Sequence, residues 1–258
     1  CIRDRTSGIG KPYDPVSQKG VVGKNYSYQT GTGATLFFSD KIFNPFMSTG
    51  GLSMLIDDFN ANWDFDRSGP QFVGGTTISG GMYHGRPIEY HPVPPGTPRW
   101  GKAWKDAMSK WYLRAMNIGS SGSVMANRYN YLDLDPTYKN ALGQPLMRMT
   151  FDYMPNEHRL SRFAAQKINE IGKSLNPQMM TAPSPRVQPW SVVPYQSTHN
   201  TGGTIMGTNP SNSVVNKYCQ SWDAHNLFIM GASLFPHNAA YNPTGPVGAI
   251  SYWAANAI

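Results

Sequence analysis

The chain has 258 residues, of which 40% are hydrophobic and 14% are charged, a balance that is typical of a folded globular protein and excludes general disorder. Its formal net charge of +7 favours an anionic substrate or partner, but the 22 Lys and Arg are scattered along the sequence, so no nucleic-acid partner is expected. No apolar run approaches the roughly 18 residues of a membrane span, so membrane association is expected only through partners or further segments.

Glycine and proline are frequent, with 26 and 21 residues, and aromatic residues make up 12% of the chain. This composition predicts long ordered loops around a scaffold, as in a loop-rich enzyme or a part of a larger assembly. The two cysteines, Cys1 and Cys219, allow at most one intrachain bridge and form no CxxC motif. The two cysteines therefore do not indicate whether the protein works in an oxidising or a reducing compartment. No metal site is expected.

The N-terminal residues 1–30 are predicted to be a loop with one short element, which ends in Gly20–Gln29. From 31 to 195 the pattern changes to short β-rich runs that are separated by glycine and proline. Leu146–Tyr153 alternates well enough to predict a half-buried strand. Two further runs of this kind are Thr35–Phe38 and Phe72–Ile78.

Two helices are predicted within this β-rich region. One covers about Trp100 to Met116, and the other is capped by Asn156. The second helix carries apolar residues at helical spacing, which predicts a core-facing stripe: Leu160, Phe163, Ala164, Ile168, Ile171 and Leu175. The nearby carboxylates Asp133 and Asp135 could imitate a metal or glycosidase pair, but the Asp-Pro step favours a strand that leads into a turn.

The C-terminal quarter contains features that together indicate a site. Leu227–Met230 is a short apolar run typical of a buried strand, and the small residues Gly231–Ser233 would let a ligand approach the backbone closely. Asn242 precedes a Pro-Thr-Gly segment and a predicted buried helix over Val247–Ala255, whose N-terminus would suit an anion or an electron-rich ring. His199 lies in a Gly/Thr loop. Alone, such a histidine is more often a surface or capping residue than a base.

The order of these features resembles the C-terminal catalytic block of the glucose-methanol-choline (GMC) flavin oxidoreductases. The matching sequence segments are Ser197–Gly207, Asn226–Ser233 and Tyr241–Gly245. The resemblance implies that His199 and Asn242 are the two catalytic side chains. Gly20–Gln29 is similar to a GMC segment with a Gly-Arg-Asn-Leu-type turn followed by Asp-His, although this chain has Lys24 for the usual Arg and Gln29 where His is frequent.

This resemblance implies a mixed α+β and α/β fold that corresponds to the later part of a GMC enzyme. Residues 1–30 would end a segment of the FAD-binding domain. Residues 31–195 would form a substrate-binding domain, an antiparallel sheet with helices. Residues 196–258 would return to the C-terminal part of the FAD-binding α/β domain and bring the catalytic His and Asn.

The resemblance also implies FAD as the cofactor. A GxGxxG turn usually receives the pyrophosphate of FAD, but none is present here, since Gly31–Leu36 has only the first two glycines and no following helix. A missing N-terminal FAD-binding segment is therefore expected. The cofactor-binding residues expected in this sequence are Gly231, Ala232, Pro243 and Thr244. Gly231 occupies a position where many relatives carry Asp. At this position the backbone N–H groups of Gly231 and Ala232 would contact the cofactor in place of the Asp side chain.

Several phrases resemble, within the family, the large flavoprotein subunits of bacterial gluconate 2-dehydrogenases and polyol dehydrogenases: Lys11–Pro15, Asn44–Phe46, Ile56–Asn60, Pro94–Gly101 and Leu132–Tyr138. The resemblance implies a sugar, sugar-acid or polyol substrate. It also implies cytochrome c and small subunits as partners and a periplasmic location at the bacterial inner membrane. The basic charge of the chain suits an acidic sugar such as gluconate.

In the mechanism that the resemblance implies, His199 accepts the hydroxyl proton as general base while hydride passes to flavin N5. Asn242 hydrogen-bonds the same oxygen, so the two side chains are expected to meet across one small cavity. An oxygen-using GMC oxidase would share this pair. A catalytically silent carbohydrate-binding or structural module is the non-enzyme alternative.

Overall fold

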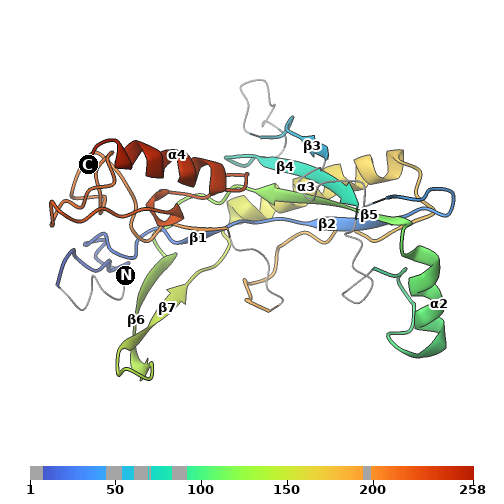
Figure 1. The fold of residues 1–258 in the computed structure, drawn as a ribbon, viewed down its shortest axis with the longest axis horizontal. Helices are drawn as coiled ribbons and strands as arrows, with labels where there is room; N and C mark the ends of the chain where they lie inside the picture. Colours follow the sequence, from blue (N-terminus) through green and yellow to red (C-terminus); the bar gives the residue numbers. More distant parts are fainter. Residues whose placement is uncertain (1–7, 45–53, 61–68, 70, 83–91, 194–198) are drawn as a thin grey trace. The chain divides into compact units, whose positions relative to one another are not determined.

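The protein divides into two compact units, each built from separate stretches of the chain. Our computed structural model describes residues 8–44, 54–60, 69, 71–82, 92–193 and 199–258 (Figure 1). The first unit contains Cys1–Gln29, Ser123–Met154 and Gln188–Ile258, and the second contains Thr30–Gly122 and Pro155–Val187. Cys1 and the start of the histidine motif, Ser197 and Thr198, lie outside the described residues.

The second unit is an antiparallel sheet of five strands with helix α3 packed on it (Figure 1). In spatial order the strands are β3 (Met54–Ile56), β4 (Thr76–Met82), β5 (Ala115–Gly122), β2 (Gly33–Phe37) and β8 (Met179–Met180). Helix α3 spans Pro155–Ser174, and helix α2 spans Gly101–Trp111. This sheet with helices confirms the antiparallel part of the predicted fold.

The alternation of β2 explains how the sheet gains a core on each face. Leu36 is fully buried in a cluster with Ile78, Ile118 and Ile168 of α3. Phe37 faces the other way, because successive side chains of a strand alternate, and its ring meets Trp111 edge-on at 5.5 Å. The predicted stripe of the second helix is therefore confirmed as core, with Leu160, Ala164 and Ile168 all buried.

Several predicted boundaries in this unit were wrong. Asn156 is not the cap of α3 but lies in its first turn, directly after Pro155. Its side-chain oxygen accepts from the backbone N–H of Val73 at 2.8 Å, and its side-chain nitrogen donates to the carbonyl of Val73 at 3.1 Å. The strand predicted over Phe72–Ile78 begins only at Thr76. The helix predicted to reach Met116 ends at Trp111, because Ala115 and Met116 pair with β2 as part of β5.

The first unit contains two small sheets and a C-terminal helix. Strand β1 (Ser27–Tyr28) pairs with β9 (Asn200–Thr201), and the hairpin β6 (Tyr131–Lys139) pairs with β7 (Pro145–Thr150). The 3-10 helix η1 covers Ala232–Leu234, and helix α4 covers Thr244–Ala255. The units group residues 123–154 with both terminal segments, whereas the sequence places them within 31–195. The assignment of the units to flavin and substrate domains stays a prediction.

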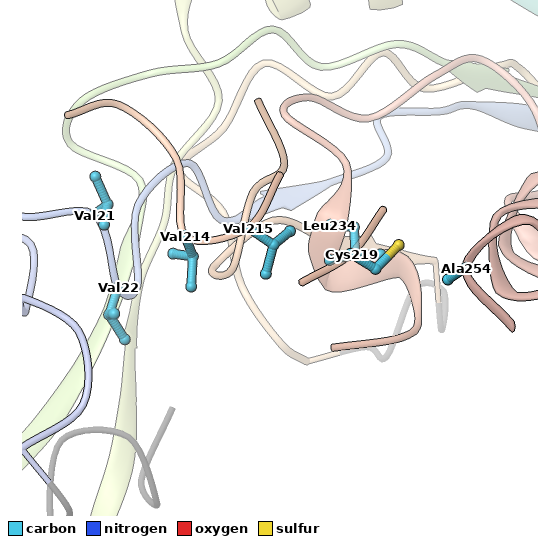
Figure 2. Close-up of a cluster of buried hydrophobic side chains, with 7 residues drawn as sticks. All are labelled: Val21, Val22, Val214, Val215, Cys219, Leu234 and Ala254. Atoms are coloured by element: carbon cyan, nitrogen blue, oxygen red, sulfur yellow. The ribbon is translucent and has the colours of Figure 1, made fainter. Parts of the chain in front are cut away.

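A buried cluster joins the N-terminal and C-terminal segments of the first unit (Figure 2). Its members are Val21, Val22, Val214, Val215, Cys219, Leu234 and Ala254. Among the described residues Cys219 is a free, buried thiol, and burial raises its pKa above the ordinary value. A second cluster holds Tyr26 and Tyr28 against Leu132, with Phe151 and Trp190 packed on it. The segment 20–29 is thereby fixed on two sides.

The hairpin corrects one expectation and supports another. Its strand β7 is mostly exposed, with Met147 52% exposed, so the predicted half-buried strand is wrong. Strand β7 ends at Thr150, and Phe151 and Tyr153 pack inward from the irregular segment that follows it. Asp133 forms a salt bridge with Arg148. Asp135 accepts hydrogen bonds from the backbone N–H groups of the two residues after Pro136, both at 2.8 Å. Both carboxylates therefore lie in strand β6, whose register shifts between Leu134 and Lys139, so the predicted strand is confirmed but it does not end in a turn at Asp135.

Two C-terminal elements also differ from their predictions. Leu227–Met230 is not a buried strand: Phe228 forms an isolated antiparallel bridge with Gln220, and Met230 is 40% exposed. Helix α4 is present as expected, but it is not buried, since Tyr252 is 79% exposed and Ala254 is its one buried residue. Within the described part of the chain, no helix has the length and apolar character that a bilayer crossing requires.

Candidate active site

The histidine loop is positioned by a short antiparallel pairing. Ser27 lies opposite Thr201 and Tyr28 opposite Asn200, so Gln29 and His199 are the adjoining positions just beyond this ladder. Side chains at opposed positions of antiparallel strands are neighbours. Accordingly, Nδ1 of the His199 ring lies 2.8 Å from Oε1 of Gln29.

The amide of Gln29 has a defined orientation. Its Nε2 donates to the backbone carbonyl of Ala239 at 3.0 Å and to that of Tyr241 at 2.7 Å. Because only the NH₂ end can donate to two carbonyls, Oε1 must face the imidazole. The ring nitrogen Nδ1 then carries the hydrogen, and the lone pair of the neutral ring resides on Nε2, an assignment made from the hydrogen-bond network.

Asn238 holds the backbone of the same histidine. Its Nδ2 donates to the carbonyl of His199 at 2.6 Å, and the side chain of Asn238 is fully buried. Asn238 is itself fixed, because its N–H and C=O both bond the backbone of Val124 at 3.0 Å. The imidazole and the main chain of His199 are therefore held by two different buried amides.

Two glycines bring the histidine loop against the segment 20–29. Gly202 has φ of +81°, and a Cβ at this position would lie 1.9 Å from the carbonyl oxygen of Asn25. Gly203 exchanges backbone hydrogen bonds with Gly23 and Lys24, at 2.7 and 2.9 Å. A side chain at Gly202 would block this close approach of the two backbones, which explains why glycine follows the histidine in this loop.

The turn at 231–234 runs beside the histidine loop. Gly202 N–H donates to Ala232, Thr204 N–H donates to Ser233, and the Thr204 hydroxyl donates to the Ser233 hydroxyl at 2.7 Å. Gly231 has φ of 116° and ψ of −179°, a region that is essentially restricted to glycine. Any other residue would be strained at Gly231, which accounts for glycine at this expected cofactor contact.

Asn242, Pro243 and Thr244 stand at the beginning of α4. Pro243 is the residue before the helix, with helical φ and ψ of −79° and −6°, and Asn242 and Thr244 are exposed. The carbonyl of Tyr241, directly before Asn242, accepts from the same Gln29 amide that contacts His199. The structure thus ties the ring of His199 and the chain beside Asn242 to one side chain. A cavity shared by His199 and Asn242 stays a prediction.

The electrostatic setting favours the neutral imidazole. Burial lowers the pKa of His199 below its ordinary value of 6.5, because desolvation disfavours the charged ring. At neutral pH the ring is therefore uncharged and able to accept a proton. No group of three or more His, Cys, Asp and Glu that could hold a metal occurs in the described parts of the chain.

Sequence reasoning did not identify the supporting amides. In the sequence, Gln29 is distinguished only by replacing the histidine that is frequent in the family, and no pattern distinguishes Asn238. The partner of Gln29 lies 170 positions away, so no local pattern reveals the contact. A separate concavity of about 410 Å³ lies on α3 in the second unit, and its lining includes Arg159, Arg162 and Phe163 but none of the predicted site residues.

Comparison with known proteins identifies the class. Residues 126–251 match the C-terminal sequence profile of the GMC oxidoreductases. The fold resembles pyridoxine 4-oxidase from Mesorbium loti, with a TM-score of 0.50 and 14% identity over 91% of this chain and 43% of that one. The chain therefore belongs to the GMC oxidoreductase family and has the fold of its C-terminal part, as the motifs indicated.

Among curated proteins, the chain is 44% identical to the gluconate 2-dehydrogenase flavoprotein of Pantoea cypripedii, over 98% of this chain and 41% of that protein. It is 28% identical to the fructose dehydrogenase large subunit of Gluconobacter japonicus, over 61% of this chain and 28% of that protein. The chain thus spans less than half the length of the relatives that it matches.

Proposed function

We propose that this chain is the part of an FAD-dependent dehydrogenase that carries its proton acceptor, and that the enzyme oxidises a CH–OH group of a sugar acid, sugar or polyol. The observation that carries the proposal is the 2.8 Å contact between Nδ1 of His199 and Oε1 of a buried glutamine, Gln29, whose amide nitrogen donates to two carbonyls. From this contact we infer a ring with its hydrogen on Nδ1. A fixed imidazole with its lone pair on Nε2 is suited to accept an alcohol proton. The similarity to the gluconate 2-dehydrogenase flavoprotein supports this class of reaction.

The residues at the start of α4 and at the 231–234 turn fit a flavin. In the described parts of the chain, no neighbouring atom lies within 4 Å of the position that a Cβ would occupy at Gly231 or Gly245, so a flat ring could approach the backbone closely. The first turn of α4 contains no acidic residue, and its N–H groups suit the electron-rich edge of a flavin. We therefore propose Gly231, Ala232, Pro243 and Thr244 as contacts of FAD, with its pyrophosphate bound by a further segment.

In the proposed reaction, His199 Nε2 removes the proton from the substrate hydroxyl. Bound FAD supplies the hydride acceptor, its N5 atom. Asn242 hydrogen-bonds the substrate oxygen and orients it without competing for the proton. The N-terminus of α4 stabilises negative charge on the reduced ring.

The substrate and partners follow from the relatives and the charge. A net charge of +7 suits an anionic sugar acid such as gluconate. The similarity to a protein named as the large subunit of fructose dehydrogenase supports assembly with further subunits. We propose cytochrome c and small subunits as partners, a periplasmic location and attachment to the inner membrane through those partners.

A second candidate function is an oxygen-using oxidase of the same family. It is favoured by 28% identity to the C-glycoside 3-oxidase of Arthrobacter globiformis over 45% of this chain and 22% of that protein. Anaerobic mixing of the purified complete polypeptide with gluconate, fructose and simple polyols, followed at the flavin absorbance, tests the reaction. Reoxidation by a quinone or cytochrome c but not by oxygen supports the dehydrogenase, and fast reoxidation by oxygen supports the oxidase. A complete polypeptide without flavin absorbance would support a silent module and overturn both.

We expect substitutions of Asn242 to separate orientation from charge. Asn242→Ala should slow flavin reduction by about fivefold, since one hydrogen bond worth about 1 kcal/mol is lost while the base remains. Asn242→Asp should be slower still, because a carboxylate opposes the negative charge that develops on the ring. Anaerobic stopped-flow bleaching measures both. Faster reduction in the Asp variant than in the Ala variant would contradict the role given to Asn242.

The pH dependence of flavin reduction should follow the lowered pKa of His199. The reaction needs the neutral ring, and burial moves its pKa below 6.5, so the rate should be constant above neutrality and fall only in the acidic range below pH 6.5. Stopped-flow measurement of flavin reduction between pH 5 and 9 gives the acidic limb of this profile, which is the fall in rate at low pH. A rate that rises through pH 7 to 9 would assign the proton to another group.

A further inference from the structure

We propose that Gln29 is a positioning residue that selects Nε2 of His199 as the proton acceptor and links the histidine to the chain beside Asn242. The inference rests on the function proposed above. It deepens that function, because it says which ring nitrogen reacts and what holds it there.

The first step is that the side-chain amide of Gln29 cannot flip by 180° without losing hydrogen bonds. In the observed orientation Nε2 donates to the carbonyls of Ala239 and Tyr241, and Oε1 accepts from His199. A flipped amide would place its oxygen against two carbonyl oxygens. Gln29 is 5% exposed, so bulk water cannot readily replace the lost donors. The contacts therefore favour one orientation, and this orientation demands a hydrogen on Nδ1 of His199.

The second step is that the backbone of Gln29 is fixed as well. The hydroxyl of Tyr153 donates to the carbonyl of Gln29 at 2.8 Å, and Tyr153 is itself buried at 5% exposure. The preceding residue, Tyr28, is paired with Asn200 in the β1–β9 ladder. The amide is thus presented to the imidazole from a rigid segment, as a supporting residue requires.

The third step concerns the link to α4. The shorter of the two bonds from Nε2, at 2.7 Å, goes to the carbonyl of Tyr241. That carbonyl belongs to the peptide group whose nitrogen is the backbone nitrogen of Asn242. A single side chain therefore positions the imidazole and the peptide before the second proposed catalytic residue. Loss of this side chain should disturb both at once.

The test uses Gln29→Leu and Gln29→Glu in the flavin-loaded complete polypeptide, with Gln188→Leu, an exposed glutamine of the same unit, as the matched control. Histidine labelled with ¹⁵N reports the tautomer of each ring by NMR, and the His199 signal is assigned from its absence in His199→Ala. Stopped-flow flavin reduction and its pH profile are measured in parallel. The NMR readout does not depend on turnover, so it separates this inference from the proposed function.

We expect wild type and Gln188→Leu to show His199 with its hydrogen on Nδ1, and Gln29→Leu to show a mixture of tautomers. Flavin reduction in Gln29→Leu should fall by about 10- to 100-fold, the usual effect of a misplaced reacting group. Gln29→Glu keeps an acceptor for Nδ1–H. It should therefore keep the tautomer, although it cannot donate to both carbonyls that the amide of Gln29 contacts.

The inference is overturned if Gln29→Leu leaves the tautomer and the reduction rate as they are in Gln188→Leu. If Gln29→Leu does not fold, Gln29→Glu decides: this variant keeps an acceptor for Nδ1–H, so a mixture of His199 tautomers in it would show that the side chain does not set the ring. Normal flavin reduction in His199→Ala would remove the proposed base, yet the tautomer measurement would still report whether Gln29 fixes the ring.

Discussion

Replacing His199 by alanine should slow flavin reduction in the complete polypeptide by about 10²- to 10⁴-fold, the usual contribution of a positioned general base. The physical reason is that the neutral ring, with Nδ1 bonded to Gln29 at 2.8 Å, has its lone pair on Nε2. Without it, water must take the substrate proton. The flavin should remain bound, because its pyrophosphate is expected to be held by a further segment. Anaerobic stopped-flow bleaching at saturating substrate measures the rate.

The matched control is His225→Ala. His225 is exposed, and the contact given by the structure uses its backbone carbonyl, which accepts from Gln220 and is unaffected by the substitution. The control should reduce its flavin at the wild-type rate. Near-normal reduction in His199→Ala would remove His199 from the mechanism, despite the family to which the chain belongs. A loss of bound flavin in His199→Ala alone would instead assign the histidine to cofactor retention.

Elements with strong local patterns could be predicted from the sequence. The stripe that includes Leu160, Ala164 and Ile168 has the spacing of a helix face, and these residues are buried on the sheet. The alternation around Leu36 and Phe37 likewise specifies a strand with two covered faces. In these cases the residues that decide the structure are close together in the chain.

Elements whose structure depends on distant partners could not be predicted in the same way. Leu227–Met230 has the composition of a buried strand, but its backbone bonds go to a neighbouring loop, from Ser221 to Leu227 and from Ile229 to Cys219. An apolar run specifies burial, not the partner that its backbone will find. The helix start at Pro155 was missed for a related reason, because the polar groups of Asn156 are taken by Val73.

The candidate site shows the same division. The motif order pointed to His199 and Asn242, but it could not reveal that buried amides at Gln29 and Asn238 hold the histidine from its ring and its backbone. Both contacts depend on the pairing of β1 with β9 and of Val124 with Asn238. The motifs predict the reacting groups, whereas the tertiary contacts indicate which nitrogen of the His199 ring carries the hydrogen.

Gly202→Ala should be the most destabilising of the simple substitutions near the site. A Cβ at Gly202 would lie 1.9 Å from the carbonyl oxygen and 2.7 Å from the carbonyl carbon of Asn25. Both are backbone atoms, so no side chain can rotate away. The loop itself would have to move, and φ of +81° adds the strain of a left-handed residue. We expect a loss of about 4 kcal/mol or more in the free energy of unfolding, at the upper end of single substitutions.

Gly143→Ala separates the two causes. Gly143 has φ of +75°, but no neighbouring atom of the described residues lies within 4 Å of its Cβ position, so alanine there should cost only the backbone strain, about 1 kcal/mol. Thermal and urea unfolding of the two variants in the same polypeptide give the difference. Because Gly202 follows the histidine by three residues, its alanine variant should also lose flavin reduction, whereas Gly143→Ala should keep it. Equal destabilisation by the two substitutions would mean that the histidine loop does not lie against Asn25, and the geometry proposed for His199 would fail with it.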